Sequence, residues 1–167
     1  KWLGVPGEKQ YRGAGVSACA TCDGFFFRNK EVAVIGGGNT AVEEALFLTN
    51  FAASVTLIHR RDSLRAEKIL QKRLLENPKV NIIWNTKVVD ILGDGNKVTE
   101  LLLKNNEGKE FKKSINGVFV AIGHQPATEI FKNQLKLDEK GYIVTELGTP
   151  NTSVKGVFAA GDVCDPV

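Results

Sequence analysis

Short apolar runs alternate with amphipathic stretches along the chain, and together they predict an α/β fold. Residues 31–35, 54–59, 80–84 and 117–123 are mostly apolar and rich in Val and Ile. Runs of this kind are typical of parallel strands that are buried on both faces. We therefore expect these four segments to form a parallel sheet, with helices in some of the connections.

Two connections have helical periodicity. The first helix is predicted from the apolar positions Ala41, Ala45, Leu48 and Ala52. Glu43 and Glu44 are expected in its first turn, where the helix dipole favours carboxylates. A second helix is predicted over residues 64–75, with Asp62 as its N-cap and Asn77-Pro78 at its end. Its apolar positions are Leu64, Ile69, Leu70, Leu74 and Leu75.

The pattern changes after residue 85. Residues 86–92, 97–105 and 110–114 are separated by Gly- and Asn-rich turns, and they predict a three-stranded antiparallel meander. Further along, residues 128–137 form a short amphipathic stretch, and residues 142–144 and 156–160 are expected as strands, the latter buried.

A glycine-rich turn joins the first strand to the first helix. Gly36, Gly38 and Ala41 match the pattern G-x-G-x-x-G/A, directly after a strand and at the start of a helix. In this context the glycines allow a tight turn and a close approach to a pyrophosphate, and the helix N-terminus faces the phosphates. The alternative is an ordinary glycine-rich turn. The pattern favours a Rossmann-like dinucleotide-binding domain.

The end of the second strand indicates which dinucleotide is bound. An NAD site usually has Asp or Glu there, but this chain has His59, Arg60 and Arg61, followed by Arg65. Guanidinium groups pair well with a 2′-phosphate dianion, so the pattern favours NADP(H). The residues expected to line the cofactor site are Gly36, Gly38, Asn39, Thr40, Ala41, His59, Arg60, Arg61, Arg65 and Gly123.

Two further residues follow strand ends. His124 comes directly after Gly123, where it is either a turn residue or a neighbour of the nucleotide. Asp162 follows the segment 156–160, where it can accept hydrogen bonds from a polyol or ribose, or act as an N-cap.

Cys19 and Cys22 form a C-x-x-C motif that Asp23 follows. Two cysteines at this spacing can close a small disulfide ring, and a nearby helix N-terminus lowers a thiol pKa. Half of a zinc site and a pair of inert thiols are the alternatives, although the chain offers few further ligands. We expect a redox pair and no metal, with Asp23 able to carry a proton to or from a leaving thiolate.

Composition narrows the class of protein. The chain has 167 residues, a net charge of +3 and no Met. The charge is too small to indicate nucleic-acid binding, and no apolar run is long enough to cross a membrane. The first residues contain no signal peptide, and the lack of Met suggests a piece of a longer protein. Three cysteines do not indicate a secreted disulfide scaffold, and we expect a cytoplasmic protein.

Four motifs stand in one order: C-A-T-C-D at 19–23, G-G-G-N-T-A at 36–41, H-R-R-D-x-x-R at 59–65 and G-V-F-A-A-G-D at 156–162. Together they resemble the low-molecular-weight thioredoxin reductases, flavoproteins of the pyridine nucleotide–disulfide oxidoreductase group. The resemblance implies electron transfer from NADPH to FAD, then to Cys19–Cys22, then to thioredoxin.

The resemblance also implies residue roles. Cys22 would lie against the flavin, Cys19 would exchange with thioredoxin, and Asp23 would donate a proton. Arg60, Arg61 and Arg65 would form the 2′-phosphate clamp. Asp162 would bind the flavin ribityl chain.

The chain departs from this family in having one glycine fingerprint where members have two. We therefore expect an NADPH domain at 11–126, flanked by FAD-domain stubs at 1–10 and 127–167. Such a fragment is expected to bind NADPH without retaining FAD or turning over. The family is usually dimeric, mainly through FAD-domain surfaces, so the parent would be a homodimer and a fragment could be monomeric.

Other functions share parts of this pattern. The flavoprotein of an alkyl hydroperoxide reductase has a similar core. A non-catalytic NADP(H)-binding module is the alternative from a different class, but it needs no dithiol followed by Asp. Ferredoxin–NADP reductases are disfavoured for the same reason.

Overall fold

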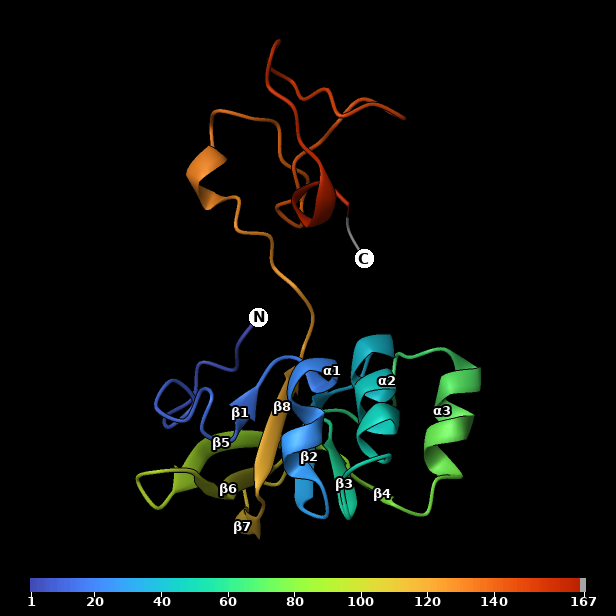
Figure 1. Cartoon of the computed structure of the whole chain (residues 1–167), viewed down its shortest axis with the longest axis vertical. Coiled ribbons are helices and arrows are strands. Elements are labelled where there is room, and N and C mark those ends of the chain that lie inside the picture. The colour runs from blue at the N-terminus through green and yellow to red at the C-terminus, as the bar shows by residue number, and fades with distance from the viewer. Residues whose placement is uncertain (166–167) are drawn as a thin grey trace. The chain divides into compact units, whose positions relative to one another are not determined.

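A five-stranded parallel sheet organises the first part of the chain (Figure 1). The computed structural model describes residues 1–165. In spatial order the strands are β1 (Val16–Ser17), β8 (Gly117–Ala121), β2 (Glu31–Gly36), β3 (Ser54–Ile58) and β4 (Val80–Ile83). The four strands predicted from apolar runs are present. The two-residue β1 is too short to leave a pattern in the sequence.

The direction of chain progression reverses at β2. From β2 the chain continues to β3 and β4 on one side, while β8 pairs with the other side of β2. In a parallel sheet of this kind, the carboxyl ends of the strands at the reversal point form the usual ligand crevice. The fold therefore places the glycine turn after β2 at that crevice.

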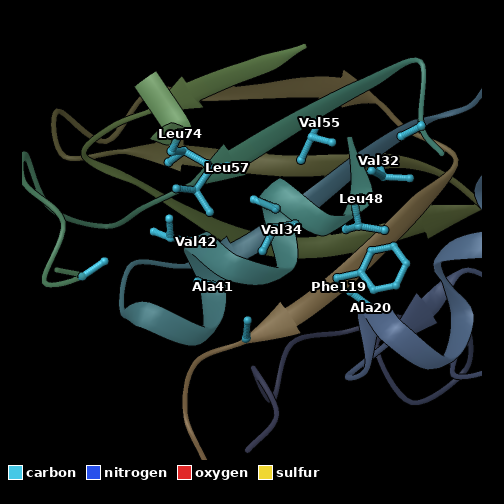
Figure 2. Close-up of a cluster of buried hydrophobic side chains, with 14 of the residues drawn as sticks. Ala20, Val32, Val34, Ala41, Val42, Leu48, Val55, Leu57, Leu74 and Phe119 are labelled. Atoms are coloured by element: carbon cyan, nitrogen blue, oxygen red, sulfur yellow. The ribbon is translucent and has the colours of Figure 1, made fainter. Parts of the chain in front are cut away.

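Helices cover one face of the sheet. They are α1 (Ala20–Asp23), α2 (Asn39–Leu48) and α3 (Lys68–Leu75), with the 3-10 turn η1 (Gly24–Phe27) after α1. Val32 and Val34 of β2 and Phe119 of β8 pack in one apolar cluster with Ala41 and Leu48 of α2 (Figure 2). The residues of this cluster are almost fully buried.

A three-stranded antiparallel sheet packs on the opposite face. Its strands are β5 (Thr86–Gly93), β6 (Val98–Asn105) and β7 (Glu110–Ser114), close to the predicted meander. Ala33 and Ile35, which alternate with Val32 and Val34 along β2, pack in a second cluster with Leu101 and Leu103 of β6. Both faces of β2 are thus buried, which explains its continuous apolar run.

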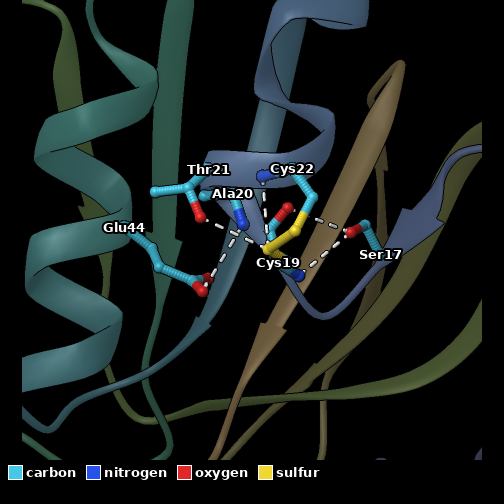
Figure 3. Close-up of a disulfide and its surroundings, with 6 residues drawn as sticks. All are labelled: Ser17, Cys19, Ala20, Thr21, Cys22 and Glu44. Atoms are coloured by element: carbon cyan, nitrogen blue, oxygen red, sulfur yellow. Dashed lines mark hydrogen bonds between the residues drawn. A yellow bond between two sulfur atoms is a disulfide. The ribbon is translucent and has the colours of Figure 1, made fainter.

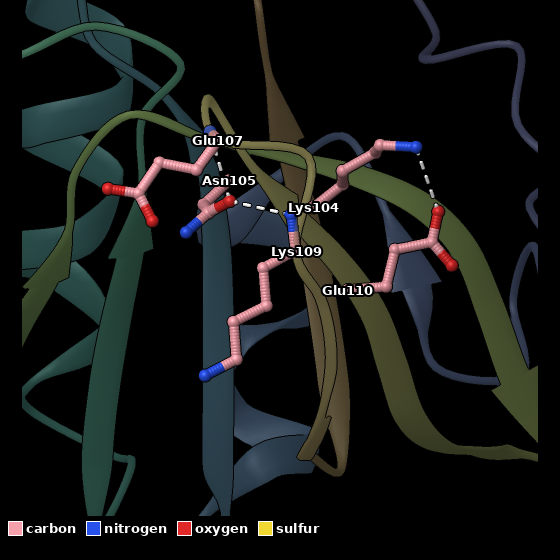
Figure 4. Close-up of polar contacts among 5 residues, drawn as sticks. All are labelled: Lys104, Asn105, Glu107, Lys109 and Glu110. Atoms are coloured by element: carbon pink, nitrogen blue, oxygen red, sulfur yellow. Dashed lines mark hydrogen bonds and ion pairs between the residues drawn. The ribbon is translucent and has the colours of Figure 1, made fainter.

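Local polar contacts set the β6–β7 turn (Figure 4). The Asn105 side-chain oxygen accepts hydrogen bonds from the N–H groups of Glu107 (3.1 Å) and Lys109 (2.9 Å). Lys104 and Glu110, paired across the strands, form an ion pair of 3.1 Å. Exposed pairs of this kind contribute little stability, so the turn geometry comes mainly from Asn105.

The second helix begins later than the sequence predicts. α3 starts at Lys68 instead of residue 64, with Glu67 at the N-cap position, so the assignment of Asp62 as its N-cap was wrong. The Arg65 N–H donates to the Gly37 carbonyl (2.7 Å), and this contact holds the preceding segment extended beside the glycine turn. Tertiary hydrogen bonds replace the helical ones here.

Two other details of the helices differ from expectation. Ile69 and Leu75 were expected on the buried face of α3, but their side chains are 55% and 64% exposed. Glu43 and Glu44 lie beyond the first turn of α2, because that helix already begins at Asn39.

The N-terminal segment forms hydrogen-bonded turns and contains no strand. Glu8, only 2% exposed, accepts hydrogen bonds from the N–H groups of Leu3 (2.7 Å) and Gly4 (2.8 Å). The Arg12 guanidinium lies 3.8 Å from Glu8 and also stacks over the Trp2 ring. These contacts fix residues 1–12 in place.

The chain divides into two compact units, Lys1–Gly123 and His124–Val167. In the second unit, the described residues 124–165 form the 3-10 turns η2 (Glu129–Phe131) and η3 (Gly161–Val163) and two isolated bridges. The strands predicted at 142–144 and 156–160 were therefore wrong. Phe158 is 65% exposed, and no sheet among these residues offers a neighbouring strand to complete either one.

Leu74 and Leu75 provide a direct test of the position of α3. Leu74 is fully buried, so Leu74→Ala is expected to lower the free energy of unfolding by about 2–5 kcal/mol. Leu75→Ala removes an exposed side chain, so a change within about 0.5 kcal/mol is expected. Chemical denaturation measures the free energy of unfolding of both variants. Equal decreases in the two variants would contradict the observed orientation of α3, in which Leu74 is buried and Leu75 is exposed.

Candidate functional site

A cavity of about 580 Å³ opens at the carboxyl ends of β2, β3 and β8. Its walls come from the N-terminal segment, the glycine turn, the end of β3, the start of β5 and the end of β8. The lining residues are Lys1, Leu3, Val5, Ile35, Gly36, Gly37, Gly38, Thr40, Ile58, His59, Arg60, Arg65, Thr86, Lys87, Val88, Ala121, Ile122 and Gly123. The predicted cofactor residues Gly36, Gly38, Thr40, His59, Arg60, Arg65 and Gly123 are thus brought together.

Each glycine of the turn meets a different constraint. A Cβ at Gly36 would lie 2.3 Å from the Ala121 carbonyl oxygen and 2.6 Å from the Ala41 Cβ, so this glycine lets β2, β8 and α2 approach closely. A Cβ at Gly37 would collide with the His59 ring at 2.2 Å. A Cβ at Gly38 would meet no atom within 4 Å, so Gly38 leaves its space open to a ligand.

The N-terminus of α2 provides hydrogen-bond donors at this turn. The Val42 N–H donates to the Gly38 carbonyl. The N–H groups of Asn39, Thr40 and Ala41 precede this bond, and N–H groups in a first helical turn have no intrahelical acceptor. Together with the helix dipole, they form a site that suits phosphate.

The three arginines do not occupy equivalent positions. All three side chains are exposed, but Arg60 and Arg65 line the cavity, whereas Arg61 is not among the lining residues. The loop that carries them is held by Asn39, whose side-chain oxygen accepts the Glu67 N–H (2.8 Å). Asn39 therefore positions the arginine loop beside the glycine turn.

His59 is a buried residue of the cavity wall, only 5% exposed. Its Nε2 lies 3.0 Å from the Ser63 carbonyl oxygen, and its ring packs edge-on against Trp84. Burial lowers the pKa of His59, and the nearby Arg61 and Arg65 act in the same direction, against the carbonyls of Ser63 and Gly36. The neutral imidazole is therefore favoured, and it supports the arginine loop.

These features fit a dinucleotide that carries an additional phosphate. An open Gly38, free helix N–H groups and two guanidinium groups around one cavity suit pyrophosphate and a 2′-phosphate. His124 and Asp162 lie in the second unit and are not among the lining residues. Asp162 is exposed on η3, whose N-cap is Ala160.

Cys19 and Cys22 form a disulfide at the start of α1, with their Cα atoms 5.3 Å apart (Figure 3). Cys19 is the N-cap of α1, and its Sγ accepts the Cys22 N–H at 3.2 Å. The Ser17 hydroxyl accepts the Cys19 N–H (3.0 Å) and donates to the Cys19 carbonyl (3.3 Å). Cys22 is exposed and Cys19 is half-buried.

Acidic residues lie close to the disulfide, and two exposed aromatic residues follow it in the chain. Asp23 follows directly, half-buried, and its N–H donates to the Cys19 carbonyl. Phe25 and Phe26 of η1 are 61% and 69% exposed. Glu44 of α2 reaches the Ala20 N–H, at 3.5 Å (Figure 3).

Sequence analysis missed several residues of these sites. Gly37 was not predicted as a site residue because the fingerprint allows any residue at that position. The signal available in the sequence was His59, whose ring leaves no room for a Cβ at position 37. Thr86, Lys87 and Val88 line the cavity from β5, which showed no chemical motif. Ser17 and Glu44 approach the disulfide only through tertiary packing.

In residues 1–165, no three His, Cys, Asp or Glu side chains gather where they could hold a metal ion. None of the helices in that range combines the length and apolar character that a membrane span requires.

Comparison with known proteins identifies related chains. The family model of the pyridine nucleotide-disulphide oxidoreductases matches residues 1–167. A thioredoxin reductase of Rickettsia felis is 55% identical over 170 residues, covering 100% of this chain and 55% of the relative. A glucosaminate ammonia-lyase of Pseudomonas fluorescens is 53% identical and is covered over 54% of its length.

Comparison with solved structures also finds thioredoxin reductases. A crystal structure of Lactococcus lactis thioredoxin reductase, in the FR conformation, superposes with a TM-score of 0.90 at 44% identity. The alignment covers 100% of this chain and 55% of that one. The chain thus spans about half the length of the relatives that it matches.

The buried His59 predicts a specific pH dependence of stability. In the unfolded chain His59 takes up a proton near its ordinary pKa of about 6.5, whereas its folded pKa is lower. The unfolded state therefore binds more protons just below that pH. We expect the free energy of unfolding to decrease as pH falls from about 7 to about 5.5.

His59→Gln isolates this contribution, because the chain's second histidine, His124, is unchanged in the variant. Burial raises the pKa of Glu44, which gives a contribution of opposite sign that both proteins share. Denaturation at several pH values should give a smaller loss for the variant than for the wild type. Identical pH profiles would mean that His59 does not resist protonation.

Proposed function

Since the chain belongs to the pyridine nucleotide-disulphide oxidoreductase family, we propose that it is the NADPH-binding and dithiol-bearing part of a thioredoxin reductase. One observation carries this proposal: the unit Lys1–Gly123 holds both a cavity lined by the glycine turn and two arginines and a C-x-x-C disulfide. A plain nucleotide-binding module would need only the cavity.

In the proposed function, the cavity selects NADPH. The pyrophosphate would bind the N–H groups at the start of α2, beside the open space at Gly38. The 2′-phosphate would lie between Arg60 and Arg65, which can donate paired hydrogen bonds to it. Thr86, Lys87 and Val88 would form the wall on the β5 side.

The disulfide supplies the second half of the reaction. Once Cys19–Cys22 is reduced, a thiolate of the pair attacks the disulfide of the partner. One S–S bond breaks and a mixed disulfide forms, which the other cysteine then resolves. We assign Cys19 to exchange with thioredoxin, Cys22 to the flavin side and Asp23 to proton transfer. FAD, held with residues outside this chain, would supply hydride chemistry between NADPH and the disulfide.

A protein substrate is supported by two aromatic residues that follow the disulfide in the chain. Phe25 and Phe26 follow α1 directly and expose most of their side chains. Exposed aromatic side chains beside a reactive group are typical of a protein-binding surface. We propose that thioredoxin contacts these two residues.

The wider setting is also part of the proposal. A dithiol that must cycle between reduced and oxidised forms suits the cytoplasm. The complete enzyme would be a homodimer.

The flavoprotein of an alkyl hydroperoxide reductase remains the second candidate, because it would use the same cavity and disulfide. The name of the Pseudomonas fluorescens relative describes that protein.

Nucleotide preference tests the first half of the proposal. In calorimetric titrations of this chain, NADPH is expected to bind at least tenfold more tightly than NADH, a difference of about 1.4 kcal/mol. Arg60→Gln and Arg65→Gln should each remove most of that preference and leave NADH binding unchanged. Arg73→Gln, on the exposed side of α3, is the matched control. Equal weakening of both nucleotides would contradict the phosphate clamp.

The aromatic surface tests the second half. In the full-length enzyme, Phe25→Ala combined with Phe26→Ala is expected to raise KM for thioredoxin by about tenfold, since exposed aromatic anchors often contribute most at an interface. Reduction of a small aromatic disulfide should be unaffected, because it needs no docking surface.

Cys22→Ser serves as the reference for this experiment, and it should abolish reduction of both substrates. If Cys22→Ser retained disulfide reduction, the assigned dithiol would be wrong. If the double Phe variant slowed both substrates equally, the effect would be on the disulfide itself and not on docking.

A further inference from the structure

Glu44 is a carboxyl group that none of the roles above uses. It lies on α2, half-buried, and its side chain points toward the start of α1 (Figure 3). Its Oε1 lies 3.5 Å from the Ala20 N–H, a long hydrogen bond. Its Oε2 is buried and has no hydrogen-bond partner among the described residues. An ionised carboxylate in this position is poorly solvated.

Glu44 forms no ion pair with any described residue. α1 and its N-cap, which pack against α2, carry Cys19, Cys22 and Asp23. α3 also packs against α2, and its cations Lys68, Lys72 and Arg73 are all exposed. Of the strands that contact α2, β2 carries the exposed Glu31, and β3 and β8 carry no charged residue.

The nearest acidic neighbour on α2 itself is Glu43, which is exposed. Burial raises the pKa of Glu44, against the Ala20 N–H, which lowers it. A protonated Glu44 is therefore favoured more than a protonated exposed glutamate would be.

We propose that the Glu44 carboxyl is coupled by charge to the Cys19–Cys22 pair, and that it holds a proton while the pair is in its reduced, thiolate-bearing form. The oxidised pair carries no charge, so an ionised Glu44 is tolerated beside it. A thiolate at Cys19 adds a negative charge at the same turn of α1, and like charges at short range raise a carboxyl pKa. Glu44 does not react itself. It acts as a positioning residue, because its charge changes how readily the reduced cysteine pair carries a thiolate.

Dithiothreitol can reduce the Cys19–Cys22 disulfide by thiol–disulfide exchange. Two electrons pass to the protein, the Cys19–Cys22 bond breaks, and the cyclic disulfide of dithiothreitol forms. Of the two thiol protons released, one remains on a cysteine thiol. The other passes to solvent at high pH, or to Glu44 at a pH between its oxidised-state and reduced-state pKa values.

This inference rests on the proposed disulfide function and gives it a pH dependence. Glu44→Gln keeps the size and hydrogen-bonding atoms of the side chain but removes its charge. At about pH 8, Glu44→Gln is expected to shift the equilibrium with dithiothreitol toward the reduced protein by about fivefold. At a lower pH, at which the thiols of the reduced pair are protonated, no thiolate charge faces Glu44 and the two proteins should agree.

The thiolate gives an independent readout. In Glu44→Gln the fraction of thiolate in the reduced protein near pH 7, measured by its ultraviolet absorbance, should be about fivefold larger. Glu43→Gln removes the same charge from an exposed position on the same helix, so it should stay within about twofold of the wild type. A purely structural role of Glu44 would not produce a difference that disappears at low pH.

The outcomes separate the two levels of the proposal. If Cys19–Cys22 does not equilibrate with dithiothreitol at all, the proposed disulfide function fails. If it equilibrates equally in wild type and Glu44→Gln at both pH values, only the role of Glu44 is overturned. Should Glu44→Gln not fold, NMR titration of isotope-labelled Glu in the wild type decides: the Glu44 pKa must be higher in the reduced protein than in the oxidised one.

Discussion

The close approach of β2, β8 and α2 at Gly36 is the constraint on which the candidate site depends. Any side chain there would collide with the Ala121 carbonyl and with Ala41, which would push the helix away from the sheet. Because this contact is so short, the first turn of α2 opens directly onto the carboxyl ends of the strands. The cavity, its helix N–H donors and the adjoining arginine loop all follow from that placement.

The same helix also connects the two chemical centres of the unit. Its first turn borders the cavity at the glycine turn, while Glu44 in its second turn reaches the start of α1 beside the disulfide. Asn39 at its first position holds the loop with Arg65. One short element thus positions the N–H groups of its first turn, the arginine loop beside the cavity and a carboxyl near the cysteines.

Sequence analysis anticipated those features that depend on local pattern. The strands of the parallel sheet are continuous apolar runs because both faces are buried, and the meander is delimited by its turns. The start of α3 was missed because Arg65 bonds to Gly37, a contact between segments far apart in sequence. The cavity wall at Thr86 and the orphaned oxygen of Glu44 likewise arise only from tertiary packing. In the second unit, apolar runs without a neighbouring strand stayed irregular.

The contact between Gly37 and His59 has a consequence for how related sequences can diverge. The imidazole occupies the volume that a Cβ at position 37 would need, so the two positions share one space. A larger residue at 37 is therefore compatible with the fold only together with a smaller residue at 59. Among homologues these positions are expected to covary, and a lineage that changes one first must pass through a less stable intermediate.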